Sequence, residues 1–245
     1  MYREIRRKKA MLEARVPFAP GVVNAISEMN LEDMIFTTLR LSGSPLSREN
    51  VGDMLKGNVV REATVHEHVM LERYRRLQEE MTDLSEMKSS LNLRTLLRLY
   101  SILTEKGSEN AYRKDNPVIY ELSYTPPHFL DVPEQMDILM KWMARENDDE
   151  FGGNELLKAA HFHCRLIEIF PFEEVSSEMA RIGLYYYMMS KGYPVFTFNF
   201  SESEYNRAIE VYLKKEDIGP LYSGLERSLF NKLDMMVMMT TGEQG

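Results

Sequence analysis

A short polar turn at residues 171–178 holds the side chains of this chain most able to do chemistry. It reads Pro-Phe-Glu-Glu-Val-Ser-Ser-Glu and separates two segments whose apolar residues recur at helical spacing. Pro171 ends the first segment because proline has no amide donor, and Ser176 or Ser177 can cap the second. A turn that leads into a helix presents unpaired amides beside the positive end of the helix dipole. The turn is therefore a natural site for phosphate.

The turn and its surroundings resemble the Fic family, whose members mostly transfer AMP from ATP to a protein hydroxyl. The family motif HPFx(D/E)GNGRxxR is matched here by FPFEEVSSEMAR at residues 170–181, and a Gly-Tyr-Pro element follows at residues 192–194. Residues 38–43 resemble the inhibitory (S/T)xxxE(G/N) helix end. Residues 113–124 resemble the substrate-positioning flap, and residues 201–217 resemble the tyrosine-containing helix beside the nucleotide base. The resemblance implies a Fic-like fold over residues 37–217.

Several motif positions depart from the family in ways that affect catalysis. Phe170 stands at the position of the general-base histidine, and a phenyl ring cannot accept a proton. Loss of a positioned base costs about 10²–10⁴ in rate. Val175 and Ser177 stand at the glycine positions, where side chains crowd the approach of backbone to phosphate. Glu178 replaces the first arginine, so a carboxylate that the helix dipole favours stands where phosphate would bind.

Other positions keep the family pattern or a polar substitute. Arg181 matches the second motif arginine, and Glu174 matches the acidic position that holds the metal in active relatives. The resemblance therefore implies no intact catalytic residue, one weak metal position at Glu174, and ATP with Mg²⁺ as cofactors only if the site is active. The expected ligand-binding residues are Ser176, Ser177, Arg181, Tyr205 and Asn206.

Two further sets of residues follow from the same resemblance. Thr38, Ser42 and Gly43 belong to the inhibitory-motif-like segment, and Ser42 occupies the position of the glutamate that pairs with the second arginine in the family. The flap is expected to include Ile119, Tyr120 and Leu122. In Fic relatives the flap edge pairs with an extended stretch of the target protein, so recognition of a protein could outlast catalysis.

Each of these positions also has a simpler structural interpretation. Phe170 and Phe172 can be core residues at a helix end, because buried aromatic rings usually pack. Glu174 and Glu178 can be solvated charges of a turn and a first helical turn. Arg181 can pair with a nearby carboxylate without binding any ligand.

Three functions are consistent with these residues. The favoured one is a cytoplasmic Fic-fold protein with a degenerate AMP-transfer site, which acts by binding a protein or a small anionic ligand. The second is an active nucleotidyl or phosphoryl transferase in which Glu173 or His163 replaces the missing histidine as base. The third is a structural or interaction module, such as one partner of a toxin–antitoxin-like pair. A shared fold does not decide between them.

Helical periodicity dominates the elements that must position this turn. We predict an all-α, Fic-like helical bundle with a small β-hairpin flap at residues 118–124, where branched, aromatic and polar residues alternate. The predicted regions are an N-terminal helical region at 1–88, a core at 89–217 and a C-terminal helix at 218–245 packed on the same body. The predicted helices are 1–15, 22–41, 48–56, 60–80, 93–103, 134–145, 155–170, 177–190, 203–214 and 219–238.

Composition narrows the remaining possibilities. The 245 residues carry a net charge of −8, so no overall basic field attracts nucleic acid, which we do not expect as a partner. Cys164 is the single cysteine and excludes an intramolecular disulfide. We expect no membrane span and no secretory signal, and hence a cytoplasmic location. Methionines cluster near the C-terminus, where a homo-oligomer contact is plausible.

Overall fold

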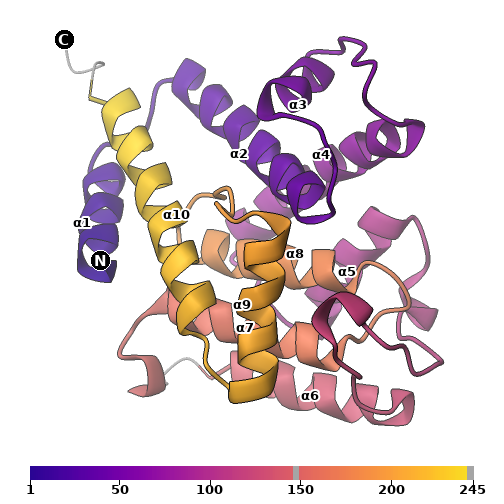
Figure 1. Ribbon diagram of the computed structural model, residues 1–245. Helices are drawn as coiled ribbons and strands as arrows, with labels where there is room; N and C mark the ends of the chain where they lie inside the picture. The colour runs from indigo at the N-terminus through magenta and orange to yellow at the C-terminus, as the bar shows by residue number, and fades with distance from the viewer. Residues whose placement is uncertain (146–148, 242–245) are drawn as a thin grey trace.

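A computed structural model describes residues 1–145 and 149–241 of the chain, and within them the helices form an all-α bundle (Figure 1). The α-helices are α1 (Tyr2–Glu13), α2 (Pro20–Leu41), α3 (Arg48–Leu55), α4 (Val65–Glu86), α5 (Leu93–Thr104), α6 (Val132–Met143), α7 (Glu155–Ile169), α8 (Ser176–Ser190), α9 (Glu202–Lys215) and α10 (Gly219–Met239). Short 3₁₀ turns occur at Ser108–Asn110, Tyr120–Leu122, Phe129–Asp131 and Asp149–Phe151.

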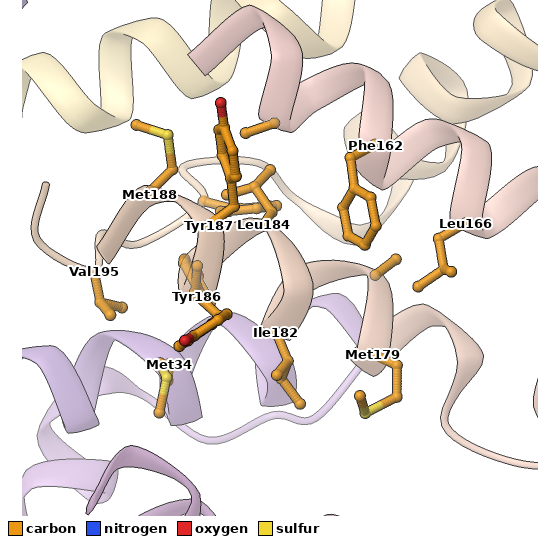
Figure 2. Packing of buried hydrophobic residues seen from close by; sticks show 14 of the residues in the cluster. Met34, Phe162, Leu166, Met179, Ile182, Leu184, Tyr186, Tyr187, Met188 and Val195 are labelled. Carbon is orange, nitrogen blue, oxygen red and sulfur yellow. The ribbon is translucent and has the colours of Figure 1, made fainter. Parts of the chain in front are cut away.

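Helices α7 and α8 form the antiparallel centre of the bundle. Gly183 of α8 packs against the ring of Phe162 on α7 so closely that a Cβ at this position would overlap the ring. Figure 2 shows Phe162 and Leu166 reaching from α7 toward α8, while Met34 of α2 approaches α8 from another side. These side chains are fully buried, and burial of this apolar surface is the main force that holds the two helices together.

The other helices surround this centre. Helices α4 and α5 pack against α8, α6 packs against α7, and α10 packs against α1, α7 and α9. Thr64 and Glu67 form a reciprocal capping box that begins α4, and Ser201 with Glu204 does the same for α9. Because the surrounding helices pack directly on α7 and α8, the turn between these two helices is held from several directions.

A buried polar cluster joins distant parts of the chain. Asp33 of α2 accepts from the ammonium of Lys232 on α10 at 2.7 Å, and both side chains are 3% exposed. The hydroxyl of Thr197 donates to the same carboxylate at 2.6 Å, and Arg48 of α3 also pairs with it. Burial lowers the pKa of Lys232, although Asp33 opposes this shift. The cluster therefore ties the two ends of the fold together.

The predicted β-hairpin flap is wrong, because the described residues contain no strand there. Ile119 and Tyr124 form one isolated antiparallel bridge, with N–H···O distances of 2.8 and 3.2 Å, around the 3₁₀ turn Tyr120–Leu122. Ser123 completes the reversal in the left-handed region at φ 48°. Pro117 and Pro126 flank the loop, and proline cannot donate to a ladder, so pairing stops after one bridge.

None of the helices within the described residues combines the length and apolar character needed to cross a bilayer. The predicted C-terminal region extends to residue 245, of which residues 242–245 lie outside the described part. The division into regions 1–88, 89–217 and 218–245 stays a prediction.

Candidate functional site

Helix α7 ends at a left-handed residue that begins the motif turn. Phe170 has φ 47° and donates its amide to the carbonyl of Leu166 at 2.9 Å. Its side chain is half-buried and lies outside the core cluster, whereas Phe172 is fully buried and stacks on Tyr100 with ring centroids 4.8 Å apart. The core interpretation is therefore confirmed for Phe172 but not for Phe170.

The predicted serine cap of α8 is wrong. The N-cap position is Val175, which makes no side-chain cap, and Ser176 is already inside the helix. The buried hydroxyl of Ser176 instead accepts from the amide of Phe172 at 2.9 Å and donates to its carbonyl at 3.1 Å. This bond pair closes the turn internally. The first amides of α8 consequently have no capping side chain.

Val175 adopts a conformation that suits glycine. Its φ of 55° and ψ of 23° place a β-branched residue in the left-handed region, where such residues are rare. This is the first glycine position of the motif that the chain resembles. The backbone of the turn therefore keeps the left-handed shape although the side chain opposes it. Ser177, at the second glycine position, is half-buried in the first turn of α8.

Arg181 is a buried cation one turn into α8. Its side chain is 3% exposed and lies 3.6 Å from the carboxylate of Glu178, measured from Nη2 to Oε1. Burial lowers the pKa of Arg181, but Glu178, Tyr205 and Tyr74 oppose this and produce a net rise. The Nε atom has no hydrogen-bond partner among the described residues. The charge reversal at residue 178 thus supplies a carboxylate to the retained arginine within the same helix.

Three further buried polar side chains surround this guanidinium. The hydroxyl of Tyr205 on α9 interacts with Arg181 and lies 2.8 Å from Nε2 of His163 on α7. Tyr74 of α4 lies close enough for the guanidinium to influence its pKa, and its hydroxyl bonds Thr38 at 2.8 Å. Burial raises the pKa of Tyr205 to about 12 and lowers the pKa of His163 to about 3. His163 is fully buried, so a target hydroxyl could not reach it as a substitute base.

The acidic metal position is occupied by an internal ion pair. Glu174 is exposed and lies 2.9 Å from the ammonium of Lys106, whose pKa it raises through this hydrogen bond. Mg²⁺ can bind through one carboxylate when substrate phosphates complete its shell. The described residues contain no group of three or more metal-binding side chains, and Glu174 already pairs with a cation. These residues do not fit a resident metal ion.

The predicted inhibitory segment lies at the end of α2. Ser42 is the exposed C-cap residue of that helix, and Gly43 follows at φ 74°. A Cβ on Gly43 would lie 3.0 Å from the carboxylate of Glu202 at the start of α9. Thr38 is the member of this segment that reaches the site, through its bond to Tyr74. Asn206, by contrast, is half-buried on α9, and no hydrogen bond within the described part of the chain links it to Arg181.

Arg113 is a site residue whose role was not predicted from the sequence. Its buried guanidinium donates from Nε to the carbonyl of Phe170 at 2.8 Å, and from Nη2 to that of Ile169 at 3.3 Å. It also donates to the carbonyls of Asp115 and Pro127. One side chain therefore ties the end of α7 to the loop expected to be the flap. A lone arginine before a predicted loop gives no sequence signal of this role.

The expected flap residues point in different directions. Tyr120 is 82% exposed, Ile119 is half-buried, and Leu122 is buried in the core. The hydroxyl of Tyr124 donates to the carbonyl of Glu168 at 3.1 Å, which fixes the loop against α7. The loop thus presents the aromatic side chain of Tyr120 to solvent.

Comparison with known proteins agrees with this architecture. Residues 90–188 match the Fic/DOC family. A Fic domain containing signaling protein from Bacteroides thetaiotaomicron VPI-5482 is similar with a TM-score of 0.82 and 17% identity, over 98% of this chain and 97% of that chain. Fic-1 from C. elegans gives a TM-score of 0.77 and 16% identity, over 98% of this chain and 72% of that chain.

A third solved structure contains IbpAFic2, as a single-residue variant, in complex with adenylylated Cdc42. It gives a TM-score of 0.53 at 17% identity, over 94% of this chain and 77% of that chain. These structural likenesses concern the fold, whereas the match at residues 90–188 concerns the family. Residues 90–188 are therefore similar to the Fic/DOC family, and the chain has the all-α fold of Fic-domain proteins.

Proposed function

We propose that this protein is a Fic-fold binding protein that recognises an anionic ligand or protein group at the α7–α8 turn and does not transfer AMP. The observation that carries the proposal is the pairing of Glu178 with the buried Arg181, in a motif whose histidine position is Phe170. Phe170 removes the proton acceptor, and Glu178 places negative charge where phosphate would bind.

Proton transfer is the first step that this turn cannot support. Attack of a target hydroxyl on phosphorus needs a base within hydrogen-bond reach of the hydroxyl proton. Phe170 has no lone pair to offer. The nearest imidazole on the same helix, His163, is buried and bonded to Tyr205, and burial holds its pKa near 3. Glu173 is an exposed carboxylate, and among the described residues no side-chain hydrogen bond or ion pair orients it as a base.

Stabilisation of the negative charge on phosphate is the second requirement of AMP transfer that this turn does not meet. Phosphoryl transfer relies on cations placed where negative charge develops. Arg181 remains, but its nearest charged partner is Glu178 at 3.6 Å, so an incoming phosphate meets a carboxylate together with the guanidinium. Glu174 is likewise paired, with Lys106. Both motif charges, Arg181 and Glu174, therefore already have an ion-pair partner within the chain.

Anion recognition remains possible because two features of the turn stay available. Helix α8 has no side-chain cap, so its first amides can bind an anion at the positive end of the dipole. The Nε atom of Arg181 is buried without a partner, which is costly unless a ligand completes its hydrogen bonds. Displacement of Glu178 would open both groups to one anion.

A transfer assay tests the absence of catalysis. We expect purified protein with labelled ATP, divalent metal and lysate to give no labelled product above a heat-killed control. Phe170→His alone should stay inactive, because Glu178 still opposes phosphate. Labelling by the unmodified protein that is lost in Glu174→Ala would overturn the proposal in favour of an active transferase with an unusual base.

Calorimetry with inorganic pyrophosphate tests the binding half of the proposal. We expect Glu178→Gln to bind pyrophosphate about tenfold more tightly than the unmodified protein, because one opposing charge near 4 Å is worth about 1–4 kcal/mol. Arg181→Lys keeps the charge and should bind more weakly. Circular dichroism checks that each variant is folded. Equal affinities for Glu178→Gln and the unmodified protein would contradict an anion site at this turn.

A further inference from the structure

A second recognition surface lies along the α4–α5 hairpin, outside the motif turn. It is an open groove of about 1190 Å³, and its lining residues come from α4, α5 and residues 105–108. None of them belongs to the motif at residues 170–181. We call it the α4–α5 groove. Such an open depression suits a segment of polypeptide better than a small molecule, because small ligands favour enclosed pockets.

The floor of the groove is apolar. Leu93 and Leu97 are four residues apart on one face of α5, and Ile102, about 180° around the helix from Leu93, adds an apolar side chain at the opposite edge of the groove. All three side chains are half-buried and pack on the edge of the core, so one side of each remains open to solvent. Leu93 and Leu97, about one helical turn apart, match two successive apolar positions of an amphipathic helix.

The rim of the groove is cationic. Arg76, Arg94, Arg98 and Lys106 stand against the two carboxylates Glu80 and Glu105, so four positive and two negative charges leave an excess of two positive charges. Glu80 pairs with Arg98 at 2.6 Å, and Glu105 pairs with Arg76 at 2.5 Å. Arg94 is exposed and forms no ion pair with the described residues. This rim is positive on a chain whose net charge is −8.

We propose that the α4–α5 groove docks an acidic amphipathic segment of another protein. Leucine-like side chains would cover the floor, and carboxylates would meet Arg94 and the rest of the rim. Charge complementarity of this kind directs partner choice and association rate. Nucleic acid fits less well, because a phosphate backbone would leave the apolar floor uncovered. The proposal goes beyond anion binding at the motif turn and does not depend on it.

The groove ends beside that turn. Lys106 lines the groove and pairs with Glu174 at 2.9 Å. A segment seated along α5 would therefore bring its own protein up to the exposed side of residues 173–174. This position explains how a partner held by the groove can also present a charged group to the turn.

Fluorescence anisotropy with a designed probe tests the proposal. The probe is a labelled helix of about 16 residues with leucines at four-residue spacing and Glu at the remaining surface positions. We expect the unmodified protein to bind it, and Arg94→Glu to bind it about tenfold more weakly. Arg61→Glu makes the same charge change in the turn before α4 and should bind like the unmodified protein. Titration of methyl-labelled protein should shift the methyl signals of Leu93, Leu97 and Ile102.

Other outcomes would overturn the proposal. The same probe with Lys in place of Glu should not bind, and equal binding would mean non-specific apolar contact. Equal affinity of Arg94→Glu and Arg61→Glu would place binding elsewhere. Displacement of the probe by a single-stranded oligonucleotide, or a dimer in sedimentation whose formation excludes the probe, would assign the groove to nucleic acid or to a second copy. Arg181→Lys should leave probe affinity unchanged, which separates this result from a failure at the motif turn.

Discussion

Val175 shows how a single residue can oppose the backbone conformation that its neighbours impose. It stands at φ 55° because the bond pair between Ser176 and Phe172, and the contacts of Phe172 with Tyr100, fix the turn around it. A left-handed conformation costs a residue with a Cβ about 1–2 kcal/mol. The turn therefore retains a geometry that its own sequence makes more costly.

We expect Val175→Gly to be more stable than Val175→Ala by about 1 kcal/mol, because both lose the same packing and only glycine is unstrained at positive φ. Urea unfolding measures the difference. At Val211, within α9, the same two substitutions should give the ordinary order with alanine more stable. A pair of variants at residue 175 that follows the ordinary order would show that the turn has no left-handed strain.

Because of His163, the stability of the fold should decrease as the pH is lowered. Its folded pKa is about 3, against about 6.5 in an unfolded chain, so the unfolded state binds more protons between these values. Its contribution is complete above about pH 6.5 and falls as the pH is lowered toward 3. Arg181 is the charged neighbour that adds to the effect, after burial itself.

We expect the free energy of unfolding to fall by about 2 kcal/mol from this residue between pH 7 and pH 5. The His163→Gln variant removes the titrating group, so its own loss over that range should be smaller by about this amount. His161 also has a pKa lowered by burial and remains in both proteins, which cancels its part. Identical pH profiles for the two proteins would refute a neutral, buried imidazole at residue 163.

At the scale of elements, Arg113 joins a loop to the end of a helix. Its cation lies at the C-terminus of α7, where the dipole is negative, and it serves carbonyls from residues 169 and 170. Loss of the guanidinium would leave buried acceptors unpaired, which costs about 1–3 kcal/mol for each group. The position of the motif turn therefore depends on a residue far from it in the chain.

Arg113→Met should lower the free energy of unfolding by about 3–5 kcal/mol. Arg113→Lys should lower it by less, because an ammonium can still donate to some of the backbone carbonyls. Hydrogen exchange should become faster for the amides of residues 113–130 and 170–178 than for those of α10. A loss that spreads evenly over all helices would indicate general destabilisation instead of a local joint.

Most helices could be predicted from apolar periodicity, and the errors have identifiable causes. The predicted helix at 60–80 begins at Val65 and runs to Glu86, because the capping box of Thr64 and Glu67 sets its start. That signal is visible in the sequence. The predicted β-hairpin was wrong for another reason. Alternation at residues 118–124 indicates a strand only if a partner strand of sufficient length exists. The proline residues on either side prevented that.

The site itself could be predicted only in part. The location of the turn and the burial of Phe172 follow from sequence, since a proline-terminated helix and a core aromatic are local features. The pairing of Arg181 with Glu178 also follows from their spacing of three residues on one helix. The sequence does not predict the contribution of Tyr74, Lys106 and Arg113, because each of these residues reaches the site from another element through tertiary packing.

At the scale of the whole molecule, the buried cluster of Asp33 and Lys232 fixes α10 to α2. Lys232→Met should cost about 3–5 kcal/mol in urea unfolding, because it leaves a buried carboxylate without its ammonium. The double variant Asp33→Leu with Lys232→Met should be more stable than Lys232→Met alone, since no lone charge remains buried. Additive losses in the double variant would mean that the two charges are not coupled in the folded protein.

The 199 positions that separate Asp33 from Lys232 also affect how the protein is made. A nascent chain leaves the ribosome from its N-terminus, so α2 emerges with its acidic group long before the matching base of α10 has been synthesised. Until then Asp33 can pair with Arg48 of α3 and bond Thr197, but it lacks the buried ammonium of Lys232. The complete Asp33 cluster can therefore form only after α10 has cleared the exit tunnel.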